Sequence, residues 1–188
     1  MASASDIPAE QNALIGAPGE TVKISSQVPV PNVGPDRVLV KTAAVALNPV
    51  DAKVCFSSFS SPGCISGCDF AGTIVAVGSH VAKALKTGDR VCGVAQGMNR
   101  NEPQAGAFAE YVSVEADFVL KLPESMSFED GATLGTAVGT CGMALFWSLQ
   151  LPATPTEPLL DKPEKGGFVL VNGGSSATGT MCIQLIKL

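Results

Sequence analysis

The residues of this chain best suited to chemistry lie near its end, where an apolar run gives way to a turn of glycine and serine. The run is Phe168 to Asn172, and the turn from Gly173 to Thr180 leads into a second apolar segment. A strand, a tight glycine turn and a helix start together present backbone N–H groups and the positive end of a helix dipole. This environment suits the pyrophosphate of a dinucleotide. An ordinary strand-to-helix turn explains the same residues, so both interpretations stay open at this point.

The turn departs from two known phosphate-binding motifs. It does not follow the G-x-G-x-x-G pattern of dinucleotide-binding folds. Gly174 and Gly179 have the spacing of P-loop glycines, but Thr180 and Met181 stand where that loop requires Lys followed by Ser or Thr. Because the lysine is missing, the sequence excludes a nucleoside-triphosphatase.

The composition is that of a globular protein without a nucleic-acid or membrane partner. The chain has 188 residues, of which 46% are hydrophobic and 15% charged, enough for one domain and part of a second. A net charge of −5 argues against nucleic-acid binding. Glycines and prolines interrupt the uncharged stretch 131–156, so we expect no membrane span. The polar first twelve residues contain no Lys or Arg, which predicts a cytoplasmic protein without a secretory or transit signal.

Three residue types attract attention as possible reactive groups. The single histidine, His80, follows a Gly-Ser turn without a ligand-spaced partner, and we expect it to be a solvated loop residue. The single tyrosine, Tyr111, is a candidate general acid, but the alternation of its segment favours half-buried packing. The cysteines form no C-x-x-C pair and are predicted to be reduced thiols in the core. They are Cys55, Cys64, Cys68, Cys92, Cys141 and Cys182.

The elements that precede the glycine turn are short β segments. Between Asp36 and Pro123, turn signals separate several runs of strand composition. Short strands at this spacing predict a small barrel or sandwich. The expected strands are Arg37–Val45, Gly72–Val77, Arg90–Val94, Ala107–Val114 and Phe118–Leu122.

The pattern changes from strand to helix at Pro123. Ser127, followed by Glu129 and Asp130, predicts a helix start, and the composition stays helical to Leu149. Glycines recur three or four residues apart along this run, and helix packing explains them better than ligand contact. They are Gly131, Gly135, Gly139 and Gly142. Four prolines between Leu151 and Gly167 predict a solvated connector.

Five motifs in order resemble those of a medium-chain dehydrogenase/reductase, and among these most closely the trans-acting enoyl reductases of fungal polyketide synthases, the lovastatin type among them. The resemblance implies a mixed β and α/β fold. Residues 1–122 would form a GroES-like β-barrel, and residues 123–188 the start of an incomplete NADP-binding Rossmann domain. The motifs are the runs Asn48 to Lys53, Gly67 to Gly78, Gly88 to Val91, Gly106 to Tyr111 and Gly173 to Thr180.

The resemblance also implies an enzyme without zinc. Zinc alcohol dehydrogenases of the superfamily take metal ligands from a Cys and a Gly-His-Glu. Here Asn48 and Gly67-Cys68-Asp69 occupy those places, and the four-cysteine structural zinc loop is absent. We therefore expect no bound metal.

The activity implied by the resemblance is NADPH-dependent reduction of an enoyl thioester carried by a polyketide synthase, in secondary-metabolite biosynthesis. Hydride would reach the β-carbon and a proton the α-carbon, while the protein stabilises charge on the thioester oxygen. The implied catalytic residues are Lys53 and Thr140. The implied cofactor contacts are Val50, Asp51, Ala52, Lys53, Ser175, Ser176, Ala177 and Thr178. The implied substrate contacts are Gly139, Thr140, Cys141, Gly142, Met143, Ala144, Leu145 and Phe146.

Members of that family continue into further Rossmann strands, so we expect a chain truncated after its first strand and helix. The strand at Phe168 would then lack neighbours on both sides. We expect weak NADPH binding, or none, by the chain itself. The alternative to an enoyl reductase is a catalytically silent product of the same family, or a module that docks on the synthase through its barrel.

Overall fold

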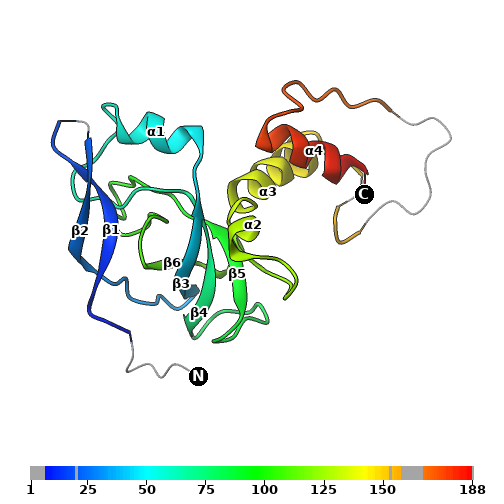
Figure 1. The fold of residues 1–188 in the computed structure, drawn as a ribbon. Helices are drawn as coiled ribbons and strands as arrows, with labels where there is room; N and C mark the ends of the chain where they lie inside the picture. The colour runs from blue at the N-terminus through cyan, green and yellow to red at the C-terminus, as the bar shows by residue number, and fades with distance from the viewer. Residues whose placement is uncertain (1–6, 20, 153, 158–166, 188) are drawn as a thin grey trace. The chain divides into compact units, whose positions relative to one another are not determined.

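The structure is a computed structural model that describes residues 7–19, 21–152, 154–157 and 167–187. The chain forms two compact units, Met1–Gly135 and Thr136–Leu188. Figure 1 shows the strands gathered in the first unit and helix α4 in the second. These units are defined by how compactly the chain is packed. The predicted boundary between a barrel domain and a Rossmann domain after residue 122 stays a prediction.

A five-stranded antiparallel sheet forms the centre of the first unit. Its order is β6-β3-β4-β5-β7, so β4 lies in the middle. Nearly every residue in the first half of β4 is buried, as expected for a strand covered on both faces. The strands are β3 (Arg37–Ala46), β4 (Asp69–Val77), β5 (Arg90–Val94), β6 (Tyr111–Glu115) and β7 (Val119–Lys121).

Each of these strands overlaps a run predicted from the sequence, but only the predicted bounds of β5 are correct at both ends. Strand β4 begins at Asp69, three residues before the predicted start at Gly72. The run expected from Ala107 becomes a strand only at Tyr111, because Ala109 makes a single isolated bridge to Ala13 before the ladder with β3 begins. The run expected from Phe118 starts one residue later, because the 3₁₀ turn η2 (Ala116–Phe118) precedes β7.

An N-terminal hairpin is present that the sequence analysis did not predict. Strand β1 (Glu10–Ala17) pairs antiparallel with β2 (Thr21–Pro29). The hairpin is joined to the rest of the unit by hydrogen bonds from Leu14 N to Phe108 O and from Ser66 N to Leu14 O. Most of β2 is exposed, although Val22, Ile24 and Val28 alternate with polar residues along it.

Two groups of buried side chains cover the two faces of the sheet. On one face, alternating β-branched and aromatic residues such as Val40, Phe70 and Ile74 form the main core. On the other, Ala71 and smaller residues pack beneath helix α2 (Phe128–Ala132). Gly72 of β4 is required between these layers, because a Cβ atom there would lie 2.1 Å from the carbonyl oxygen of Lys41.

The predicted helix start at Ser127 is confirmed, but the expected long helix is divided. The Ser127 Oγ accepts a hydrogen bond from the Asp130 amide at 3.0 Å, which caps α2. Helix α2 ends at Thr133, whose hydroxyl donates back to the Asp130 carbonyl. Helix α3 (Gly135–Gly142) then begins, and a π-helical turn η3 (Met143–Ser148) follows it.

The four glycines between Gly131 and Gly142 differ in whether a side chain would fit at their positions. A Cβ at Gly131 would lie 2.5 Å from the Leu122 side chain, and one at Gly135 would lie 2.2 Å from the Gly93 carbonyl oxygen. A Cβ at Gly139 or Gly142 would meet nothing within 4 Å among the described residues. The packing interpretation is therefore confirmed for the first two glycines and wrong for the last two.

The predicted strand Phe168–Asn172 does not form. Residues 167–171 have no regular secondary structure, and the side chains of Phe168 and Leu170 are exposed. A strand exists only through hydrogen bonds to a neighbour, and none of the described strands pairs with this segment. Helix α4 (Ala177–Lys187) follows as expected.

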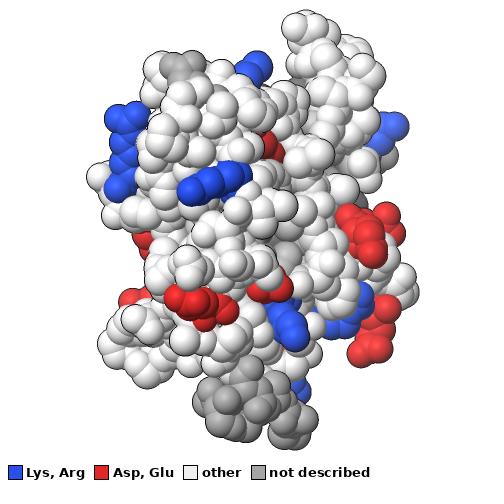
Figure 2. Space-filling model, turned by 60° about the vertical axis from the view of Figure 1, so that its left-hand side comes forward, with Lys and Arg blue, Asp and Glu red and all other residues white. Residues whose placement is uncertain are grey.

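Two remaining expectations concern the surface and the connector. No helix within the described ranges is long and apolar enough to cross a bilayer. On the face drawn in Figure 2, basic side chains lie scattered among acidic ones. The connector predicted from Leu151 to Gly167 lies largely outside the described residues.

The central position of β4 leads to a prediction about stability. Replacing the fully buried Ile74 by alanine should lower the free energy of unfolding by about 2–5 kcal/mol, since it removes core contacts and leaves a cavity. Ile24→Ala makes the same change on β2 at a side chain that is 78% exposed, and should cost less than about 0.5 kcal/mol. Urea unfolding of both variants measures the difference, and equal losses would contradict the assigned core.

Candidate active site

Helix α1 (Pro49–Cys55) carries the first group of predicted cofactor contacts, and its start is fixed by two carboxylates. The Asp51 Oδ2 accepts a hydrogen bond from the Asn48 backbone N–H at 2.7 Å. The Asn48 side-chain amide donates to Asp69 Oδ2, also at 2.7 Å. Pro49 at the first helical position has the φ angle that a helix needs. Asn48 therefore joins the beginning of α1 to the first residue of β4.

A cavity of about 170 Å³ lies beside this helix. Its walls include Val50 and Asp51, two of the predicted cofactor contacts, together with Cys68. The neighbouring Ala52 and Lys53 are exposed on α1 and do not line it. The complete lining is Val50, Asp51, Val54, Cys55, Gly67, Cys68, Gln96, Gly97 and Met98.

The sequence analysis missed the loop that closes this cavity. Gln96 and Met98 line it from the segment after β5, and Met98 adopts a positive φ of 57°. Between them, Gly97 packs so closely that a Cβ would lie 2.5 Å from the Gly67 amide nitrogen. Gly97 is visible in the sequence as a turn signal, but no signal indicates that its neighbours face α1.

Burial makes the thiols around this site weak acids. Burial, followed by the charge of Asp51 and a hydrogen bond to it, raises the pKa of Cys68 to about 12. Burial, with a smaller contribution from Asp69, raises the pKa of Cys92 to about 11. Both thiols are therefore protonated at neutral pH, and neither is an activated nucleophile.

The positions that the resemblance compares with the zinc ligands of alcohol dehydrogenases hold a hydrogen-bonded polar cluster here. Asn48 and Asp69 are bonded to each other, and Cys68 is a neutral thiol. Across the part of the chain that the structure describes, no three His, Cys, Asp or Glu side chains are grouped so as to hold a metal ion.

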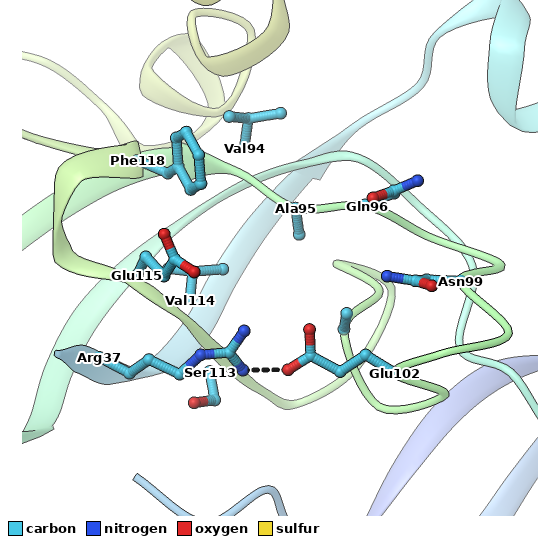
Figure 3. Close-up of a pocket in the computed structure, with 11 residues that line it drawn as sticks. Arg37, Val94, Ala95, Gln96, Asn99, Glu102, Ser113, Val114, Glu115 and Phe118 are labelled. Atoms are coloured by element: carbon cyan, nitrogen blue, oxygen red, sulfur yellow. Dashed lines mark hydrogen bonds and ion pairs between the residues drawn. The ribbon is translucent and has the colours of Figure 1, made fainter. Parts of the chain in front are cut away.

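A larger cavity, of about 330 Å³, lies in the same unit but contains none of the predicted site residues. Figure 3 shows Arg37 and Glu102 pointing toward each other across it, as an ion pair. Val94 and Phe118 form part of its apolar wall. The pairing of the Arg37 guanidinium with a carboxylate leaves this cavity without an evident anion-binding charge, so we place the candidate site at α1.

In the second unit, the predicted phosphate turn forms the capped start of α4. The Ser176 Oγ accepts a hydrogen bond from the Gly179 amide at 3.1 Å, and the Ser176 amide donates to Gly173 O at 2.9 Å. A Cβ at Gly179 would lie 2.2 Å from Gly173 O, so the turn requires glycine there. The amides of Ala177 and Thr178 have no acceptor within the described ranges and belong to the positive end of the helix dipole.

The predicted substrate contacts lie on α3 and the π-helical turn after it. Cys141 and Leu145 are buried, whereas Thr140 and Met143 are exposed. An apolar hollow of about 500 Å³ is lined by Gly142, Met143, Phe146 and Trp147. Trp147 was not among the predicted contacts, although it is the only tryptophan in the chain.

For Tyr111 and His80 the sequence favours a structural role over a chemical one, and their environments agree with that preference. Tyr111 is buried on β6, where its backbone N–H donates to Gln11 Oε1 at 2.6 Å, which confirms the packing interpretation. His80 is a largely exposed loop residue, and its Nδ1 lies 3.8 Å from Asp36 Oδ1, which confirms the loop assignment.

Comparisons with known proteins identify the class to which this fold belongs. Residues 34–124 match the alcohol dehydrogenase GroES-like domain. An alcohol dehydrogenase superfamily protein from Novosphingobium aromaticivorans superposes with a TM-score of 0.74 at 26% identity, covering 93% of this chain and 49% of that one. The CurK enoyl reductase, at 21% identity, shares the fold with a TM-score of 0.66, covering 93% of this chain and 50% of that one.

The chain belongs to the medium-chain dehydrogenase/reductase family. Within this family it is similar to fungal trans-enoyl reductases. It is 53% identical to caaB of Aspergillus niger over 97% of this chain and 50% of that protein. It is 50% identical to buaC of Petromyces alliaceus, with the same two coverages. The chain thus spans about half the length of the curated relatives it matches.

The raised pKa of Cys68 leads to a prediction about thiol reactivity. At pH 8 we expect iodoacetamide to alkylate Cys68 at least about 100-fold more slowly in the folded chain than in the unfolded one, because only the thiolate reacts. The sign follows from the raised pKa, since Cys68 keeps its proton until about pH 12 in the folded state, whereas an ordinary thiol has a pKa of 9.0. Fragmentation mass spectrometry distinguishes Cys68 from its neighbours.

Two matched variants test whether the charge of Asp51 contributes to the slow alkylation of Cys68. Asp51→Asn removes the nearby charge but keeps an acceptor for the Asn48 amide, and should accelerate alkylation of Cys68 several-fold. Asp117→Asn changes an exposed carboxylate in η2 and should have no effect. Equal rates in all three proteins would mean that Asp51 does not influence this thiol.

Proposed function

We propose that this chain provides the barrel and the cofactor turn of an NADPH-dependent trans-acting enoyl reductase that serves a polyketide synthase. The observation that carries the proposal is the open start of α4, where the Ala177 and Thr178 amides remain available to an anion. The similarity to trans-enoyl reductases over nearly the whole chain then favours enoyl reduction over other dehydrogenase chemistry.

The residues at both predicted contact regions fit a dinucleotide. The first turn of α4 contains no acidic residue, so nothing there repels a pyrophosphate. Ser175 to Thr178 would hold the phosphates, and Val50 to Lys53 would contact the nicotinamide end. The cavity beside α1 offers Val50 as an apolar wall and Gln96 as an amide group. When bound, NADPH would supply the hydride for the β-carbon of the substrate.

The chain's own residues would stabilise and orient the substrate. The Lys53 ammonium is exposed on α1 and would stabilise negative charge on the thioester oxygen. The exposed Thr140 hydroxyl would donate a hydrogen bond to the substrate. Methionine, phenylalanine and tryptophan side chains along the π-helical turn would contact an acyl chain.

The protonated thiols support this substrate class. An enoyl thioester is a Michael acceptor, and a thiolate close to it would add to the β-carbon and inactivate the site. The pKa of Cys68, about 12, keeps that thiol protonated under working conditions. A protonated Cys68 would not add to an alkene bound in the cavity beside α1.

The proposed function also includes a partner protein and a cellular compartment. A reductase that acts in trans receives its substrate from another protein, here a polyketide synthase in the cytoplasm. The described residues that would contact the acyl group line an apolar hollow in which Met143 and Trp147 are exposed.

Activity is tested by following NADPH oxidation with an enoyl pantetheine thioester. Lys53→Met should lower kcat/KM about 100-fold, because it removes the cation that stabilises the thioester oxygen. Lys23→Met makes the same change at an exposed lysine of β2 and should leave kcat/KM unchanged. A full-length trans-enoyl reductase serves as the positive control. No turnover by any form of this chain, while the control is active, would favour the catalytically silent product or docking module.

Cofactor affinity is a separate prediction. We expect the isolated chain to bind NADPH more weakly than micromolar, because the 188 residues contribute one phosphate-facing turn to the site. A fluorescence titration against the same full-length relative measures this, and micromolar affinity of the isolated chain would refute it.

A further inference from the structure

Two cysteines of the second unit lie in direct contact. Cys141 is on α3 and Cys182 on α4, and their sulfur atoms are 3.1 Å apart. The contact joins residues that are 41 positions apart in the sequence, so it depends on the folded packing of the two helices. Both are free thiols in this structure.

The geometry is close to that of a disulfide. Sulfur atoms in a disulfide are about 2.05 Å apart, so the two thiols need to approach by only about 1 Å. Cys141 is fully buried, whereas Cys182 is partly exposed. An oxidant in solution therefore reaches Cys182 first, and Cys141 is in place to resolve the product.

The two thiols are connected to the start of α4. Cys182 donates to the Cys141 sulfur, and Cys141 donates to the Thr178 carbonyl at 3.2 Å. Thr178 lies in the first turn of α4, beside the open amides of the phosphate turn. Removal of the thiol hydrogens would end the hydrogen bond from Cys141 to this turn.

We propose that Cys141 and Cys182 are a site of reversible oxidation by peroxides, which converts them into an intrachain disulfide between α3 and α4. The Cys182 thiolate attacks one peroxide oxygen, which forms a sulfenic acid and releases hydroxide. The Cys141 sulfur then attacks the sulfenic sulfur, the S–O bond breaks and the S–S bond forms. With hydrogen peroxide, two thiols and one peroxide give one disulfide and two waters, and a dithiol reductant reverses the change.

The same chemistry is less favoured at the other cysteines. Cys55 and Cys64 belong to one buried cluster, but no sulfur contact joins them. Burial raises the pKa of Cys141 to about 12, and it also raises the pKa values of Cys55, Cys64, Cys68 and Cys92. The sulfur contact, and not thiol acidity, therefore distinguishes the pair. These four thiols provide an internal comparison within the same molecule.

Peptide mapping after mild peroxide treatment tests the proposal on the intact 188-residue chain. Trypsin places Cys141 alone in the peptide 122–165 and Cys182 alone in the peptide 166–187. We expect these two peptides to become linked, with the loss of two hydrogens, about tenfold faster than any other cysteine pair. Dithiothreitol should restore the separate peptides.

Three controls make the result decisive. Cys182→Ser should abolish the linked peptide, whereas Cys68→Ser, the same change at a thiol outside the pair, should leave its rate unchanged. Circular dichroism establishes that both variants remain folded. In guanidinium chloride the preference for the 141–182 pair should disappear, because it depends on folded contact. A failure of the two peptides to link in the folded chain, or equal linkage among all cysteines, would overturn the proposal.

Discussion

The buried carboxylate of Asp69 is the constraint on which the arrangement of the first unit depends. Asp69 is the first residue of the central strand β4 and is almost fully buried. A buried carboxylate is strongly destabilising unless it is hydrogen-bonded, and the Asn48 side chain meets part of that requirement. Because Asn48 also donates its backbone N–H to Asp51, helix α1 is attached to the sheet at its first turn. The cavity beside α1 takes its position from this attachment.

The sequence predicts the strands whose side chains alternate or are buried on both faces, because such patterns are direct consequences of packing. It therefore locates β3, β4 and β5 but misses the hairpin of β1 and β2, although β1 alternates in burial and Val22, Ile24 and Val28 alternate with polar residues along β2. The opposite error occurs at Phe168 to Asn172. Its composition is that of a strand, but a strand requires a hydrogen-bonded neighbour, and composition contains no information about that neighbour.

The candidate site also contains residues that the sequence predicts and residues that it misses. The phosphate turn is recognisable because each of its parts has a local cause: Ser176 caps the helix, and Gly179 leaves room for the Gly173 carbonyl. Val50 and Asp51 are identified by resemblance, and the structure places both in one cavity. Gln96 and Met98 reach that cavity only through long-range folding of the loop after β5. No local pattern predicts such a contact, so sequence reasoning finds the turn and misses the loop.

The thiols of this chain differ in their expected reactivity because their surroundings differ. A thiol reacts with an alkene or a peroxide only as the thiolate, so burial and neighbouring carboxylates protect it. Cys68 and Cys92 are protected in this way, since burial and the charges of Asp51 and Asp69 raise their pKa values. Burial raises the pKa of Cys141 as well, but Cys141 and Cys182 differ from the others because each has another sulfur within contact distance. Proximity makes oxidation intramolecular once it begins, and burial of the second thiol does not prevent that step. Environment would therefore give thiols of the same chain opposite chemistry, with inertness at Cys68 and Cys92 and the proposed pairing at Cys141 and Cys182.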